Sequence, residues 1–235
     1  MNALPATACT DRPSGKLSQP KLKVIRLGRV AYAPTLALQH RLARRVRDEP
    51  DRALLLLVEH DPPVITLGRR GRRSDVLASR ETLVAAGVEV YRAGRGGQTT
   101  CHSPGQLVAY PILHLRRLGL TLREYVARLE GAAVLTLRRF GLAARRDGSR
   151  AGAWNDGAKI AFVGVAVRRW VTSHGLAINV SNDLRCFEWI VPCGLAGDRM
   201  TSLRERLGRE VAVSEVAGVL EGSFAAAFGF QAGAT

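Results

Sequence analysis

Short apolar runs alternate with longer amphipathic stretches along the chain. Five apolar runs have the length and the aliphatic content of strands: LKVIRLG (22–28), ALLLLVEH (53–60), PVITLG (63–68), VEVYRAG (88–94) and GQLVAYPILHL (105–115). Four stretches have helical periodicity: TLALQHRLARRVRDE (35–49), SRETLVAAG (79–87), TLREYVARLEGAAVLTLRRFG (121–141) and SEVAGVLEGSFAAAFG (214–229). Strands interleaved with helices predict the α/β class, with a sheet as the frame.

The longest helical stretch carries signals at both of its ends. Thr121 and Glu124 have the spacing of a capping box, and Gly141 is placed to end the helix. Beyond it, residues 152–180 are rich in β-branched side chains. They predict a long hairpin or meander that turns around Trp170.

No internal repeat or interdomain linker divides the chain after its first residues. We therefore predict a flexible tail over residues 1–21, rich in Pro, Ser, Thr and Ala, and one domain over residues 22–235. The tail lacks the apolar core of a secretion signal, although a mitochondrial-targeting interpretation stays open. No stretch reaches the roughly 18 uninterrupted apolar residues of a membrane span, so we expect that the protein does not enter a membrane. We also expect a cytoplasmic monomer.

The charge of the chain comes from arginine. The chain has 35 basic and 20 acidic residues, a net charge of +15, and 31 of the basic residues are Arg. Such a surface favours acidic partners, whether nucleic acid, anionic lipid or an acidic protein. A non-catalytic nucleic-acid-binding domain is one alternative. The arginines are scattered, however, and only 6% of residues are aromatic, which argues against a platform for stacking bases.

The four cysteines are Cys9, Cys101, Cys186 and Cys193, and no two of them form a CxxC pair. This spacing argues against a zinc site and against a disulfide framework, so we expect no metal. It fits a protein of the reducing cytosol.

A glycine-rich stretch, YRAGRGGQTTCHSPGQLVAY (91–110), directly follows a predicted strand. Its glycines let backbone amides line a concavity that a ligand can approach. The alternative is a hairpin with glycine turns, since neither a P-loop nor a dinucleotide fingerprint is present. His102 and Cys101 lie inside the stretch, and as isolated residues they fit a structural histidine and a small apolar filler.

Lys159 is the only lysine after residue 23, in GAKIAFVGVAVRRWVTSHGLAINV (157–180). Arginine keeps its proton in proteins, whereas a partly desolvated lysine can lose its proton and act as a base. Lys159 is therefore a candidate base, although a single solvated lysine in a strand is the alternative. His174 in the same stretch is a second histidine next to a glycine.

Cys193 lies between Pro192 and Gly194 in FEWIVPCGLAGDRMTSL (187–203), at the edge of an apolar run. A nucleophilic thiol must be reachable and partly ionised, with donors near the oxyanion that forms. Gly194 leaves room for an acyl group beside the sulfur, although a buried cysteine in a tight turn would also fit. The candidate bases for it are Lys159, His102 and His174.

Together, residues 95–112, 157–180 and 187–203 resemble the three signature blocks of the lipoyl(octanoyl) transferases, and EHDPPVITLGRRGRRSDVL (59–77) is similar to the lead-in of that family. The resemblance implies the fold of biotin and lipoate protein ligases, a mixed β-sheet flanked by helices of the α/β (α+β) class. It implies transfer of an octanoyl group from acyl carrier protein to a lysine of lipoyl domains, in 2-oxoacid dehydrogenase E2 subunits and the glycine cleavage H protein. Neither a cofactor nor nucleic acid is expected.

The resemblance also implies the roles of particular residues. The acyl-thioester cysteine falls on Cys193, and the lysine that lowers the pKa of its thiol falls on Lys159. The residues implied to line the substrate site are Arg95, Gly96, Gly97, Gln98, Thr99, Thr100, Cys101, His102, Phe162, Val163, Gly164, Gly175, Leu176 and Ala177. Cys101 stands where the family usually has Tyr, and Ser103 where it has Gly, which puts the chain-length preference in question.

The nearest rival within the same fold is an ATP-dependent lipoate or biotin protein ligase. Its glycine-rich loop resembles residues 94–105, and its key lysine also begins a strand with the letters KI. Such ligases do not need the cysteine of the PCG motif, so Cys193 discriminates between the two activities.

Overall fold

The structure is a computed structural model, and it describes residues 20–148, 150–192 and 198–231. The predicted tail lies outside these residues except for its last two positions. The elements run in the order β1 (Lys21–Val30), α1 (Tyr32–Asp48), β2 (Arg52–His60), β3 (Val64–Leu67), η1 (Arg73–Asp75), α2 (Arg80–Ala85), β4 (Glu89–Arg92), β5 (Thr99–His102), β6 (Gln106–Ile112), α3 (Leu122–Arg139), β7 (Ala153–Asn155), β8 (Ala158–Arg168), β9 (Val171–Asn179), η2 (Leu184–Phe187), α4 (Leu203–Leu207) and α5 (Val213–Phe228).

Two mixed sheets form the frame. The larger has six strands in the order β1-β2-β6-β9-β8-β7, and the smaller has three in the order β4-β3-β5. β1 pairs with β2 in parallel and β3 with β4 in parallel, while the other pairs are antiparallel. Both the helices and the mixed sheets confirm the expected fold class.

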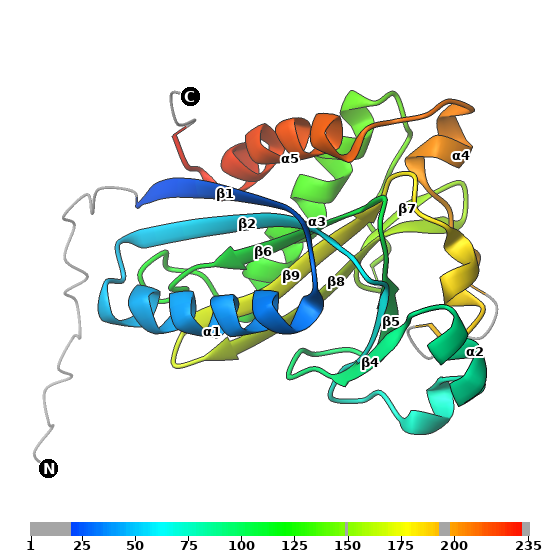
Figure 1. Ribbon diagram of the computed structural model, residues 1–235. Helices are drawn as coiled ribbons and strands as arrows, with labels where there is room; N and C mark the ends of the chain where they lie inside the picture. Colours follow the sequence, from blue (N-terminus) through cyan, green and yellow to red (C-terminus); the bar gives the residue numbers. More distant parts are fainter. Residues whose placement is uncertain (1–19, 149, 193–197, 232–235) are drawn as a thin grey trace, which may run out of the picture.

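The larger sheet is covered on both faces. In β2, Leu55 and Leu57 point into a core shared with α3 and α5, whereas Leu54 and Leu56 point into a core shared with α1 and α2. This alternation follows from the period of two in a strand. Figure 1 shows α3 and α5 on one side of the sheet and α1 on the other.

The helix ends and the hairpin turn that the sequence predicts are present in the structure. Thr121 and Glu124 form the capping box that begins α3, and Gly141, with φ +83, follows its last turn. β8 and β9 form a hairpin whose two turn residues, Arg169 and Trp170, both have positive φ, as tight hairpins require. Four elements were not predicted: β5, inside the glycine-rich stretch, the single-turn helix α4, and the short 3₁₀ helices η1 and η2.

Candidate active site

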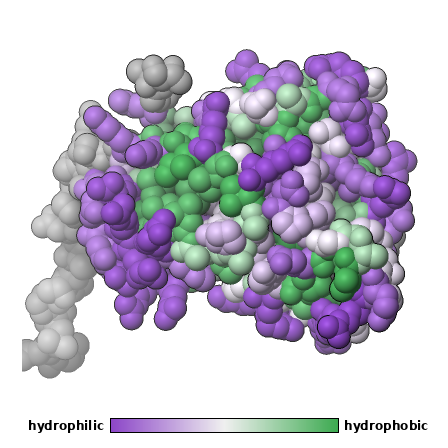
Figure 2. Space-filling view, viewed as in Figure 1, coloured by the Kyte–Doolittle hydropathy of each residue, from purple (hydrophilic) through white to green (hydrophobic). Residues whose placement is uncertain are grey.

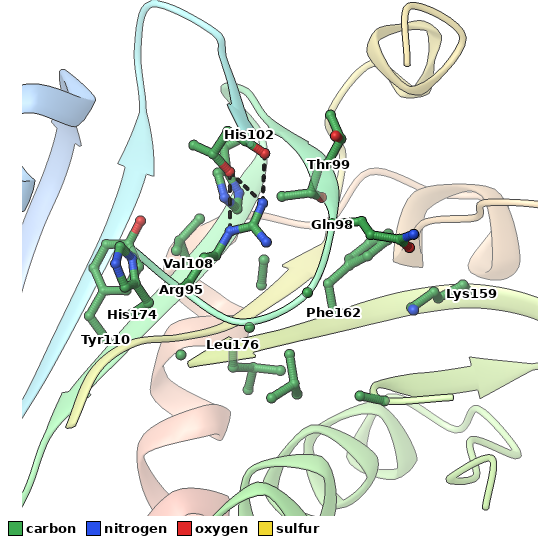
Figure 3. Close-up of a pocket in the computed structure, with 18 of the residues that line it drawn as sticks. Arg95, Gln98, Thr99, His102, Val108, Tyr110, Lys159, Phe162, His174 and Leu176 are labelled. Atoms are coloured by element: carbon green, nitrogen blue, oxygen red, sulfur yellow. Dashed lines mark hydrogen bonds between the residues drawn. The ribbon is translucent and has the colours of Figure 1, made fainter. Parts of the chain in front are cut away.

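A cavity of about 350 Å³ lies where the small sheet and the glycine-rich stretch meet β6, β8 and β9 of the large sheet (Figure 3). Cavities of this size accept small-molecule ligands. Its lining residues are Tyr32, Thr66, Arg70, Arg95, Gly97, Gln98, Thr99, Thr100, His102, Val108, Tyr110, Arg150, Ala151, Lys159, Phe162, Val163, Gly164, His174, Gly175, Leu176 and Ala177.

The cavity brings together most of the residues singled out in the sequence. Lys159 lines it, as do all but two of the implied substrate-site residues, the exceptions being Gly96 and Cys101. Cys101 instead packs in the core beside Cys186, and a hydrogen bond with Cys186, together with burial, raises the pKa of the Cys101 thiol well above its ordinary value. Cys193, the proposed nucleophile, lies outside the described residues.

Seven lining residues were missed by the sequence analysis: Tyr32, Thr66, Arg70, Val108, Tyr110, Arg150 and Ala151. Tyr32 begins α1, and Tyr110 lies in the middle of β6. No local pattern marks either residue, because only the packing of α1 and β6 around the cavity brings them there. Arg70 belongs to the GRRGRR run that was noted only as a family lead-in.

Glycines at the cavity wall make room for the buried side chain of Arg95. Its guanidinium donates to the carbonyl of Thr66 at 2.7 Å and to the hydroxyl of the same residue at 2.8 Å. A Cβ atom on Gly164 would lie 3.1 Å from Cδ of Arg95, and one on Gly68 would lie 2.7 Å from Nη1. Gly68, after β3, and Gly164, in β8, therefore leave the space in which Arg95 of the glycine-rich stretch packs.

Lys159 is 3% exposed and comes from the start of β8. Its ammonium nitrogen lies 5.1 Å from the ring centre of Trp154 and 5.3 Å from that of Phe162. Contacts of this kind with aromatic faces favour a cation. In Figure 3, Lys159 lies at one end of the cavity, while Tyr110 and His174 lie at the opposite end.

The described residues on either side of the 193–197 segment are bonded to the cavity wall. Pro192 forms a parallel bridge with Thr99, and Met200 forms one with Lys159. Asp198 forms an ion pair with Arg150 at 2.7 Å, and the guanidinium of Arg150 lies 4.0 Å from the ring centre of Trp154.

Three histidines lie at or behind the end of the cavity far from Lys159. Burial lowers the pKa of His60 to about 4, of His102 to about 3 and of His174 to about 4, so all three are neutral near pH 7. Nδ1 of His60 lies 3.1 Å from the carbonyl of Val30, which can only accept, so this nitrogen carries the proton. The hydroxyl of Tyr110 then donates to Nε2 of His60 at 2.7 Å.

His102 begins a buried network of hydrogen bonds. Its Nδ1 donates to Oε1 of Gln106 at 2.6 Å, and the amide nitrogen of Gln106 donates to Oδ1 of Asn179 at 2.8 Å. The amide nitrogen of Asn179 donates in turn to the carbonyl of Thr201 at 3.0 Å. The network joins β5, β6 and β9 to the segment that pairs with Lys159.

Two further properties concern the described residues alone. No cluster of three or more His, Cys, Asp or Glu side chains among them is arranged to hold a metal ion. None of the described helices combines the length and apolarity needed to cross a bilayer.

Comparison with known proteins identifies the family. Residues 31–225 match the family model of the lipoyl protein ligase A/B catalytic domain. The octanoyltransferase of Syntrophobacter fumaroxidans is 49% identical over 198 residues, which cover 83% of this chain and 86% of the relative. The chain belongs to the family of lipoyl protein ligase A/B catalytic domains. Its members also include a Homo sapiens relative named octanoyl-acyl-carrier-protein:protein N-octanoyltransferase, mitochondrial, which is 47% identical over 210 residues, 85% of this chain and 90% of the relative.

Solved structures share the fold at much lower identity. Lipoate-protein ligase A bound with ATP aligns over 92% of this chain and 88% of its own length, with a TM-score of 0.71 and 16% identity. The bipartite lipoate protein ligase of Thermoplasma acidophilum aligns over 92% of this chain and 86% of its own, with a TM-score of 0.71 and 17% identity. The ligase-like fold and the family resemblance expected from the sequence are both confirmed.

Proposed function

We propose that this acyltransferase moves an octanoyl group from octanoyl-acyl carrier protein to a lysine of lipoyl domains, in 2-oxoacid dehydrogenase E2 subunits and the glycine cleavage H protein. One observation carries the proposal. The cavity has Lys159 at one end, and the apolar side chains of Phe162 and Leu176 lie between it and the far end, as an acyl chain attached near Lys159 requires (Figure 3). The names of the curated relatives support the same reaction.

The reaction runs through Cys193 in two steps. In the first, the Cys193 thiolate attacks the carrier thioester, a new carbon–sulfur bond forms, and the carrier thiolate leaves with a proton from the Lys159 ammonium. In the second, the amine of the acceptor lysine attacks the octanoyl-cysteine and gives its proton to the now neutral Lys159. An amide forms and Cys193 leaves as thiolate. Because the carrier thioester is already an activated acyl donor, neither step needs ATP.

Two features of the described residues favour Lys159 over the histidines as the base. A general base works best when its pKa lies near the working pH, and the pKa values of His102 and His174 are lowered to about 3 and 4. The backbone of Lys159 is also bonded to Arg199 and Thr201, two and four residues after the 193–197 segment ends. The histidines sit at the far end of the cavity instead.

Intact-protein mass spectrometry after mixing with octanoyl-acyl carrier protein tests the proposal directly. We expect the protein to gain the mass of one octanoyl group without ATP or magnesium, and to lose it when a lipoyl domain is added. Cys193→Ala should form no adduct. Cys101→Ala is the matched control, and it should keep the adduct because Cys101 does not line the cavity.

Two outcomes would contradict the proposal. An adduct on Cys193→Ala would place the nucleophile elsewhere. A strict requirement for ATP, with free octanoate as the donor, would favour the ligase activity of the structural neighbours.

A further inference from the structure

Four exposed arginines, Arg69, Arg70, Arg72 and Arg73, lie together after β3, and we call residues 69–73 the arginine loop. None of the four forms an ion pair with a carboxylate in the parts of the chain that the structure describes. The nearby Asp75 accepts from the amide of Arg72 and from the hydroxyl of Thr99, both at 2.8 Å. The arginine loop thus concentrates four positive charges, and in the described structure the Asp75 carboxylate is held by the Arg72 amide and the Thr99 hydroxyl rather than by a guanidinium.

The arginine loop is fixed to the cavity wall. The amide of Arg69 donates to the carbonyl of Arg95 at 2.9 Å, and that of Arg70 to the carbonyl of Gly97 at 3.1 Å. The side chain of Arg70 itself lines the cavity. The loop therefore stands at the cavity with its backbone already ordered, so binding there costs little chain entropy.

Residues just after the arginine loop are bonded to the described residues that precede Cys193. The amide of Val191 donates to the carbonyl of Asp75 at 2.7 Å, and the amide of Leu77 donates to the carbonyl of Trp189 at 2.8 Å. Pro192 follows and bridges to Thr99 on the cavity wall. The arginine loop is thus joined to the cavity wall on one side and, through Asp75 and Leu77, to the described residues just before Cys193.

We propose that the arginine loop binds the phosphate of the prosthetic arm on which the donor carries its acyl thioester. This inference rests on the proposed function, since a carrier protein presents its thioester on a phosphopantetheine arm whose phosphate is an anion. Guanidinium groups suit this ligand because their planar forks donate paired hydrogen bonds to phosphate oxygens. Gripping the arm would hold the thioester carbonyl at the mouth of the cavity.

Two small donors isolate the phosphate. S-octanoyl-pantetheine and S-octanoyl-4′-phosphopantetheine differ only in that group, and neither has the protein surface of a carrier. At low ionic strength, where screening is weak, we expect the parent enzyme to use the phosphorylated donor with a kcat/KM about tenfold higher. The double variant Arg70→Gln/Arg72→Gln should bring this ratio to within about twofold of one.

Matched variants separate local binding from general charge. Arg44→Gln/Arg45→Gln removes the same charge from the exposed side of α1, where Figure 2 shows hydrophilic side chains gathered at the left. Arg44 lies twelve residues, or about 18 Å along the helix, from the cavity residue Tyr32. This control should keep the tenfold ratio. Arg70→Lys/Arg72→Lys should keep part of it, because charge remains but the paired donors are lost.

The outcomes are distinct. The inference is overturned if the parent enzyme uses the two donors with nearly equal kcat/KM. This measurement does not depend on whether any variant folds. An unchanged ratio in the loop variants, or an equal loss in the α1 control, also overturns it. If Arg70→Gln/Arg72→Gln melts at a lower temperature, Arg72→Gln/Arg73→Gln gives the second measurement, since it leaves the cavity-lining Arg70 in place.

Failure of the proposed function would give a different result from failure of this inference. In that case the parent enzyme transfers octanoyl from neither donor nor from the carrier protein. A ratio of one combined with single-stranded RNA binding that falls only in the loop variants would overturn the inference and assign the arginine loop to nucleic acid.

Discussion

The carbonyl of Lys159 accepts a hydrogen bond from the amide of Thr201 at 3.0 Å. This bond, with the one from the Lys159 amide to the carbonyl of Arg199 at 2.8 Å, pairs residues 199–201 with the start of β8. The residues that follow the 193–197 segment are thereby held at the same strand position as the proposed base. The geometry gives Lys159 a fixed backbone, so changes of its side chain should act on chemistry more than on folding.

Lys159→Arg should be nearly as damaging to turnover as Lys159→Ala. A guanidinium keeps the positive charge and can still favour the thiolate, but it cannot accept a proton from the acceptor lysine at neutral pH. We expect Lys159→Arg to accumulate octanoyl-enzyme and to release it slowly. Single-turnover measurements of acylation and deacylation check this. Deacylation at the parent rate would reduce Lys159 to an electrostatic partner.

Acyl-chain length should be limited by the polar end of the cavity. Tyr32, Tyr110, His102 and His174 line that end, and the hydroxyl of Tyr32 is buried without a hydrogen-bond partner in the described structure. Each methylene missing from an octanoyl donor should lower kcat/KM by about fourfold, which corresponds to about 0.8 kcal/mol. Longer donors should fail sharply, since their ends would have to enter among polar atoms. A smooth rise in kcat/KM through about sixteen carbons would disprove the limit.

The buried histidines should make the fold sensitive to mild acid. The pKa values of His60, His102 and His174 are lowered to about 4, 3 and 4, below the ordinary value of 6.5. Between pH 6.5 and 4 the unfolded chain therefore binds more protons than the folded one, so the free energy of unfolding falls as the pH falls. Each histidine contributes up to about 1.4 kcal/mol per pH unit.

Urea denaturation at a series of pH values from 8 to 5 measures this effect. We expect a flat profile above pH 7 and a steady loss below about pH 6.5. A free energy of unfolding that stays constant down to pH 5 would show that the histidines take up protons without cost.

Gly175→Ala should destabilise the protein by about 2–3 kcal/mol. A Cβ atom at Gly175 would contact the carbonyl oxygen of Ala109 and lie 2.6 Å from Cδ of Pro111, so β9 and β6 would have to separate. Gly131→Ala in α3 is the matched control, because nothing lies within 4 Å of its added Cβ and alanine favours a helix. Thermal melting of both variants decides the matter, and equal melting temperatures would contradict the prediction.

The sequence predicted the elements whose signals are local. The capping box of Thr121 and Glu124 and the turn at Trp170 depend on neighbours a few residues away, and the structure has both. β5 was missed because TTCH has neither length nor alternation. It is a strand only because it pairs with β3, with Cys101 opposite Ile65.

The candidate site shows the same division. Lys159 stood out because arginine supplies nearly all the other positive charge of the chain. Tyr32 and Tyr110 gave no signal, because they reach the cavity through the packing of α1 and β6. The buried state of Cys101 matched its interpretation as an apolar filler, whereas the family pattern had grouped it with the substrate site.

The hydrogen bonds that run from His102 through the side-chain amides of Gln106 and Asn179 to the carbonyl of Thr201 fix which way each of the two amides faces. Turning either amide around would set donor against donor or acceptor against acceptor at both of its ends. A genetic screen for loss of lipoylation should accordingly yield inactive alleles at Gln106 and Asn179, although neither side chain lines the cavity. Such alleles would map the machinery that aligns the enzyme rather than the surface that its substrates touch.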